Sequence, residues 1–133
     1  MRITEKTYLT AAKLNNMKIL SSKIHGIIDY LFVIFLAASP SIFKMEMPLS
    51  CIAYGLGAVH LLLTLLTKFE LGLIKVIPFR IHGLIELVVA IALGSLATWY
   101  RSKGNDFGFY YFMGLALAIL VVFNLTDFKG ARK

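Results

Sequence analysis

The sequence predicts an all-α fold, a bundle of four transmembrane helices built from two tandem two-helix repeats. Three observations lead to this prediction. Apolar residues make up 59% of the 133 positions and charged residues only 16%, against about 45–50% and 25% in soluble domains. The apolar residues gather into four long runs, and one seven-residue motif occurs twice. An ordinary soluble globule and a disordered chain are both excluded.

Each apolar run has close to the ~20 residues that a membrane-spanning helix needs. The first run begins too late and is too long for a cleavable signal peptide, so we expect it to be retained. Polar residues at 44–48, 67–80 and 101–106 separate the runs, which occupy residues 24–43, 49–66, 81–100 and 107–125. The predicted organisation is a basic N-terminal segment (1–22), a membrane domain (23–128, with repeats 23–69 and 80–128) and a tail (129–133).

The net charge of +7 is distributed unevenly between the two sides of the predicted membrane domain. Eleven of the fourteen basic residues precede the first run, follow the fourth, or lie between the second and third. The positive-inside rule therefore places both termini in the cytoplasm. We interpret the basic face as a signal of topology and lipid attraction rather than of nucleic-acid binding. The expected partner is the lipid bilayer, and a homo-oligomer or a larger membrane complex stays open.

The repeated motif is K/R-I-H-G-x-I-D/E, found at Lys23–Asp29 and again at Arg80–Glu86, 57 residues later. A looser match at an offset of 59 relates Thr67-Lys-Phe69 to Thr126-Asp-Phe128. Two membrane crossings separate the copies, so both copies have the same orientation. The repeat therefore predicts a pseudo-two-fold axis along the membrane normal.

Two-helix repeats with a Ser-Pro-Trp motif in the first helix define the SPW-repeat family of small prokaryotic membrane proteins. The chain resembles this family over residues 23–128, since Ser39-Pro40 is followed by Ser41 where the family has tryptophan. The second copy has Ser95 without the proline, and Trp99 follows nearby. The resemblance implies a multi-pass protein of a bacterial or archaeal inner membrane, and it brings no activity to these positions.

Charged groups inside a bilayer are expensive, so Asp29 and Glu86 require an explanation. Each follows a histidine by four residues, giving the pairs His25–Asp29 and His82–Glu86. Residues four apart share a helix face, so each pair can bond internally and point the same way. A glycine follows each histidine, which leaves room for another backbone or a ligand to come close. His60 on the second helix is expected at a similar depth, and Asn124 on the fourth is expected at the rim.

Three interpretations of these six ligand candidates stay open. The His/acid pairs can serve only to fix helix register, as in an accessory or structural subunit of a larger complex. They can form a pocket that binds or conducts a proton, a cation or a small polar ligand, with transport as one version. They can also hold a metal, with His25, Asp29, His82 and Glu86 as ligands, or a haem in a redox protein.

No cofactor is favoured by the sequence. No phosphate-binding loop, nucleophile elbow or zinc-protease motif is found, so no catalytic residue and no enzyme activity are predicted.

Overall fold

The computed structural model describes residues 2–15 and 18–130. Four long helices match the four predicted spans, with no end shifted by more than two residues. A shorter helix precedes them, and two short strands lie between the second and third long helices. The elements are α1 (Ile3–Asn15), α2 (Ser22–Ile42), α3 (Leu49–Leu66), β1 (Thr67–Lys68), β2 (Ile77–Pro78), α4 (Phe79–Ser102) and α5 (Asp106–Leu125).

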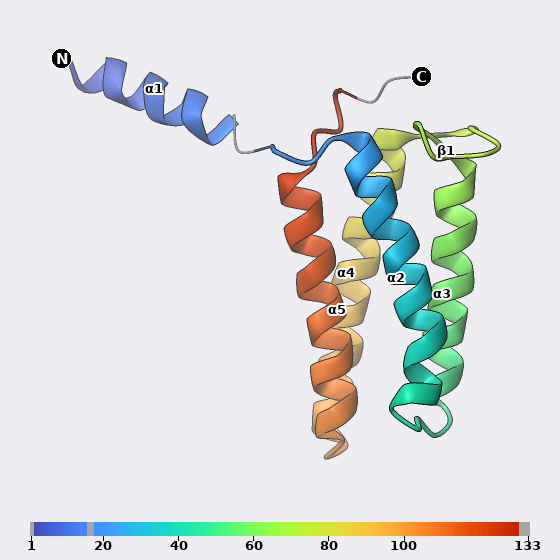
Figure 1. Cartoon of the computed structure of the whole chain (residues 1–133). Coiled ribbons are helices and arrows are strands. Elements are labelled where there is room, and N and C mark those ends of the chain that lie inside the picture. The colour runs from blue at the N-terminus through green and yellow to red at the C-terminus, as the bar shows by residue number, and fades with distance from the viewer. Residues whose placement is uncertain (1, 16–17, 131–133) are drawn as a thin grey trace.

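The four long helices stand side by side as two hairpins, α2 with α3 and α4 with α5 (Figure 1). The backbones of the two helices within each hairpin contact each other far more extensively than the backbones of the two hairpins do. The described parts of both termini lie at the end of the bundle where α2 and α4 begin. Lys23, Lys68, Lys75 and Arg80 lie at this end too, and we call it the basic end.

The bundle is apolar on its outside as well as in its core, unlike a soluble domain. Large apolar residues in the middle of each helix are strongly exposed, for example Leu31, Val59, Val88 and Val121. All four helices are long and apolar enough to cross a membrane. The membrane-protein prediction is supported in this respect, because exposed apolar flanks of this extent need a lipid environment.

Small side chains allow the helices to approach one another in the core. Ala53, Ala90 and Ala97 are almost fully buried among leucines and aromatic residues. Far from the basic end, the Ser39 hydroxyl and the Tyr111 hydroxyl lie 2.7 Å apart and join α2 to α5. Close approach through small residues is the usual packing mode of membrane helices.

Short backbone pairings at the basic end fix the segments that enter and leave the helices. β1 pairs with β2 in parallel, so the residues after α3 lie beside the residues before α4. In the same way Leu20, just before α2, pairs with Thr126, just after α5. These pairings hold Thr67 and Thr126 in place beside the first turns of α4 and α2.

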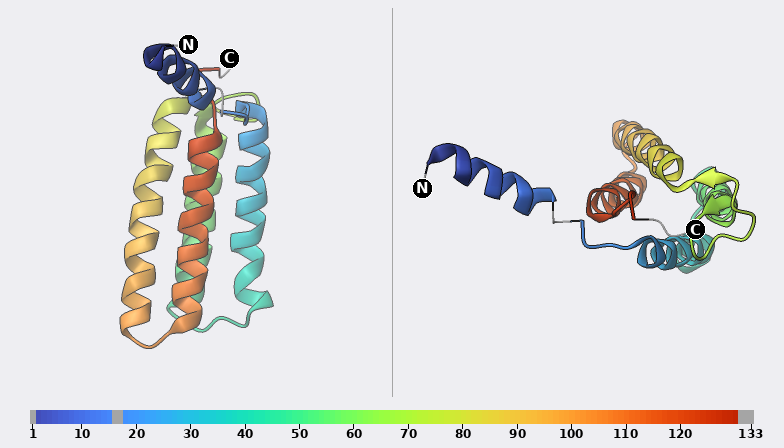
Figure 2. Two further views of the ribbon diagram at one scale, coloured as in Figure 1. Left: turned by 90° about the vertical axis from the view of Figure 1, so that its left-hand side faces the viewer. Right: turned by 90° about the horizontal axis from the view of Figure 1, so that it is seen from above.

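The described part of the N-terminal segment contains the helix α1, which extends sideways from the bundle in Figure 1 and in the right-hand view of Figure 2. Its residues Ile3, Tyr8 and Leu9 are exposed. Residues 1 and 16–17 of the predicted segment 1–22, and residues 131–133 of the predicted tail, lie outside the described residues.

Candidate metal centre

Two His/acid pairs meet between the hairpins at the basic end. His25 and Asp29 lie one and two turns into α2, and His82 and Glu86 take the same places in α4. All four side chains are at most 5% exposed. One ligand atom from each residue lies within 4.8 Å of the ligand atoms of the other three. We call these four residues the centre.

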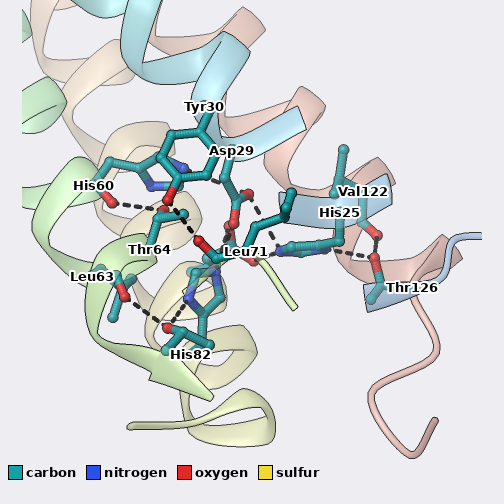
Figure 3. Close-up of polar contacts among 12 residues, drawn as sticks. His25, Asp29, Tyr30, His60, Leu63, Thr64, Leu71, His82, Val122 and Thr126 are labelled. Carbon is teal, nitrogen blue, oxygen red and sulfur yellow. Dashed lines mark hydrogen bonds and ion pairs between the residues drawn. The ribbon is translucent and has the colours of Figure 1, made fainter. Parts of the chain in front are cut away.

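Histidine and carboxylate alternate around the centre. His25 Nε2 lies 3.3 Å from Asp29 Oδ1 and 3.2 Å from Glu86 Oε2. His82 Nε2 lies 3.3 Å from Asp29 Oδ2 and 3.4 Å from Glu86 Oε1. Each carboxylate therefore turns one oxygen to the histidine of its own helix and the other to the histidine of the opposite helix. Figure 3 shows His25, His82 and Asp29 converging in this way.

A threonine fixes the outer nitrogen of each histidine. Thr126 Oγ1 lies 2.8 Å from His25 Nδ1, and Thr67 Oγ1 lies 2.7 Å from His82 Nδ1. Each threonine hydroxyl has one hydrogen, which it donates to a backbone carbonyl four residues earlier, Val122 or Leu63. Each threonine must therefore accept the second bond, so both histidines carry a hydrogen on Nδ1 and donate it outward.

The inner nitrogens face the carboxylates without a hydrogen bond between them. Among the described residues, His25 Nε2, His82 Nε2 and both oxygens of Asp29 have no hydrogen-bond partner, and neither has Glu86 Oε2. A neutral imidazole protonated at Nδ1 presents a lone pair at Nε2. Lone pairs therefore face carboxylate oxygens in a buried space, an arrangement that is costly unless positive charge lies between them. A divalent cation, or one added proton on each histidine, would make the centre electrically neutral.

The donor set fits a transition-metal dication. Zinc binds imidazole nitrogen and carboxylate oxygen at ~2.0–2.2 Å, so neighbouring ligand atoms of a tetrahedral site lie about 3.4 Å apart. The four histidine–carboxylate separations of 3.2–3.4 Å are close to this spacing, but each runs to a different carboxylate oxygen. With one ligand atom from each residue, all four atoms lie within 4.8 Å of one another, so small side-chain movements would complete a tetrahedral site. Metal-bound histidines also commonly donate their other N–H to a fixed acceptor, the role that Thr67 and Thr126 have here. Imidazole suits zinc, iron and nickel better than calcium or magnesium.

A haem bound by both histidines fits this geometry poorly. The porphyrin would have to lie between the two axial imidazoles. In this structure Asp29 and Glu86 bridge the two imidazoles and take up that space.

Three phenylalanines close the centre on the side of the basic end. The Phe79 ring packs edge-on against His25, with ring centroids 5.2 Å apart, and contacts the rings of Phe69 and Phe128. A Cβ on Gly26 would overlap the Phe69 ring, and a Cβ on Gly83 would overlap the Phe128 ring. The expectation that these glycines admit a backbone or a ligand is therefore corrected, because aromatic rings take that space.

The two remaining candidates differ in their relation to the centre. His60 reaches its edge, with Nε2 3.6 Å from Asp29 Oδ1. Asn124 does not join it: the side chain is exposed and donates to the Leu120 carbonyl of its own helix. The threonines and phenylalanines around the centre were not anticipated by the sequence analysis. The Thr-x-Phe match between the repeats was the signal that contained four of them.

Comparisons with protein-family models, with curated proteins and with solved structures find no match to this chain. The SPW-repeat resemblance therefore stays a prediction.

Proposed function

We propose that this protein binds a transition-metal dication inside the membrane, with His25, Asp29, His82 and Glu86 as its ligands. The observation that carries the proposal is the orientation of the two histidines. Their Nδ1 hydrogens point outward to threonines, so their Nε2 lone pairs point at two carboxylates across gaps that contain no hydrogen bond. Bound metal would neutralise the two carboxylates and satisfy both imidazoles.

The arrangement of the ligands also supports a duplicated hairpin as the origin of the centre. Each repeat supplies one histidine, one carboxylate and one threonine. Thr67, at the end of the first repeat, bonds the histidine of the second, and Thr126 bonds the histidine of the first. The ion would therefore be bound between two equivalent halves, in a membrane protein whose basic end faces the cytoplasm.

Metal titration of the full chain in lipid nanodiscs tests the proposal. We expect the wild-type protein to bind one Zn²⁺ per chain, as measured by isothermal titration calorimetry. The double variant Asp29→Asn/Glu86→Gln keeps the size of both side chains and removes both charges, and it should bind none. Asn124→Ala, a change at a polar residue outside the centre, should leave binding unaltered. Equal binding by the wild type and the double variant would refute the proposal.

The stability of the metal-free double variant separates metal binding from a purely structural role. If two charged histidines and two carboxylates formed permanent ion pairs, removing the carboxylate charges would destabilise the fold by about 3–5 kcal/mol. For a metal centre without its metal, we expect the same substitutions to leave the free energy of unfolding unchanged or to increase it. The new amides can donate to the Nε2 lone pairs, and two unpaired buried charges are lost. Thermal unfolding without metal should therefore show an unchanged or higher midpoint in the double variant.

A further inference from the structure

The centre takes one histidine and one carboxylate from each hairpin, but the residues beside it differ between the hairpins. His60 of α3 has its Nε2 3.6 Å from Asp29 Oδ1 and its ring 6.4 Å from the His82 ring. The corresponding position of the second repeat, 59 residues later, is Ile119. The first repeat therefore adds a potential nitrogen ligand that the second lacks.

The His60 ring is held less tightly than the rings of the centre. His25 and His82 are fully buried and each is fixed by a threonine, whereas the His60 side chain is 14% exposed. In the described part of the chain its buried Nε2 has no hydrogen-bond partner. Its ring meets Phe32 edge-on, with centroids 6.2 Å apart. A small movement of this ring would bring Nε2 to an ion bound at the centre.

A small cavity lies on the same side. It has a volume of about 50 Å³ and is lined by His60 and Glu86 together with apolar residues that include Val89, Leu93 and Ile119. Leu93 and Val89 follow Glu86 along α4, so the cavity extends from the centre toward the middle of the bundle, away from the three phenylalanines. A space of this volume is large enough for water, since a cavity needs about 10–15 Å³ to hold one water molecule.

The loosely held His60 ring and the adjacent cavity are typical of an exchangeable metal site and not of a closed structural one. Structural zinc sites are closed by four fixed ligands, whereas reactive sites keep a position open. Ligand exchange at a four-coordinate ion proceeds most easily when a fifth ligand is added first. His60 is the side chain placed to be that ligand, and the cavity is the space into which an incoming water molecule fits.

We infer that His60 is a fifth, exchangeable ligand of the metal centre, and that the ion is exchanged on the side of the cavity. This inference rests on the proposed function. It adds that the site accepts ions able to expand from four to five ligands. It also adds that the protein loads and releases its metal rather than keeping it as a fixed structural element.

Cobalt is a suitable probe, since Co²⁺ replaces zinc and its visible absorption reports coordination number, being several times more intense in four-coordinate sites. We expect the full chain loaded with Co²⁺ to show a weak five-coordinate spectrum. His60→Ile, which copies the residue of the second repeat, should still bind one Co²⁺ but give an intense four-coordinate spectrum. Asn124→Ile, the same kind of change away from the centre, should leave the spectrum unaltered.

The rate of metal extraction by a soluble chelator gives the second readout. We expect His60→Ile to slow extraction about ten-fold, which corresponds to about 1.4 kcal/mol on the exchange barrier, because exchange then lacks its fifth ligand. Val89→Phe should fill the cavity and slow extraction while leaving the cobalt spectrum five-coordinate. X-ray absorption of the wild-type protein should independently show three imidazoles around the metal.

The outcomes separate this inference from the proposed function. If the wild type binds Co²⁺ and His60→Ile changes neither the spectrum nor the extraction rate, His60 is no ligand and the inference falls while the proposed function stands. The inference also falls if His60→Ile and His60→Gln both abolish binding, because His60 would then be an obligatory ligand. If the wild type binds no metal, the proposed function falls and the inference with it.

Discussion

The single hydrogen of a threonine hydroxyl sets the chemistry of the centre. Thr67 and Thr126 give that hydrogen to backbone carbonyls, so each can only accept from a histidine. The two histidines are thereby held in one tautomer, with Nε2 free on the inner side. Two hydroxyls outside the ligand set thus decide which atoms of His25 and His82 a metal can reach.

This role predicts the effect of removing either hydroxyl. Thr67→Val and Thr126→Val keep the shape of the side chain but leave a buried Nδ1–H without an acceptor. We expect each to weaken Zn²⁺ binding by about 10–100-fold, the usual effect of losing a partner of a metal-bound histidine. Isothermal titration calorimetry measures this directly, and Thr67→Ser should restore most of the affinity.

Thr64→Val is the matched control for these variants. Thr64 is buried one turn before Thr67 and its hydroxyl bonds only the His60 backbone carbonyl among the described residues. Its replacement should leave zinc affinity within about two-fold, since the same buried hydroxyl is lost without removing a hydrogen-bond partner of the centre. A loss in Thr64→Val equal to that in Thr67→Val would show that the threonines matter for packing alone.

At the scale of the helices, the Phe69 ring packs against the start of α2 and the Phe128 ring packs against the start of α4. Both rings lie where the side chain of an ordinary residue would be, against Gly26 and Gly83. The rings belong to the segments that leave α3 and α5. Each hairpin is therefore closed at the basic end by contact between its own first and last turns.

Alanine at either glycine is expected to disturb this closure. Gly26→Ala and Gly83→Ala would push the phenylalanine ring away, at a cost of about 1–3 kcal/mol for overpacking. Gly94→Ala, at a helical glycine with open space around it, should be neutral or stabilising by up to about 1 kcal/mol. Thermal unfolding in nanodiscs compares the three. A midpoint of Gly26→Ala at or above that of Gly94→Ala would contradict the packing described here.

The helices and the two His/acid pairs could be predicted from the sequence because each depends on local spacing. Apolar runs give the spans, and residues four apart share a face, which places His25 with Asp29 and His82 with Glu86. The threonines could not be assigned a role in this way. Thr126 is 101 positions from His25, and their contact depends on how α5 ends beside α2.

The position of Asn124 also differs from the prediction, because it too depends on how the helices pack against one another. Asn124 was expected at the rim on depth alone, but its face of α5 points away from the centre. Depth follows from counting residues along a helix, whereas the direction of a side chain depends on how that helix is rotated against its neighbours. His60 lies beside the centre, as predicted from its depth, because its face of α3 turns inward.

At the scale of the whole molecule, both described chain ends and the centre lie at the basic end of the bundle. We expect this end to face the cytoplasm, as the distribution of basic residues predicts. Single cysteines in a Cys51→Ser background test this orientation. Lys44→Cys, in the turn between α2 and α3, should react with an impermeant maleimide in intact cells. Lys75→Cys, in the loop between α3 and α4, should react only after lysis, and the reverse pattern would invert the topology.

Metal should also hold the two hairpins together, because the centre lies between them. The contacts between the two hairpins are much less extensive than the contacts within each hairpin. A ligand present at 100 times its dissociation constant stabilises the state that binds it by about 2.7 kcal/mol. We expect zinc at that excess to raise the unfolding midpoint of the wild type, and a chelator to reverse the effect. The double variant Asp29→Asn/Glu86→Gln should show no shift, whereas an equal shift in both proteins would place the binding elsewhere.

The central claim is that one metal ion lies between His25, Asp29, His82 and Glu86. Anomalous diffraction at the zinc absorption edge, from crystals of the full chain grown with zinc, tests it most directly. We predict one strong anomalous peak per chain, within bonding distance of both Nε2 atoms and of both carboxylates. A well-ordered centre without a peak, or zinc bound only at surface residues, would contradict the claim.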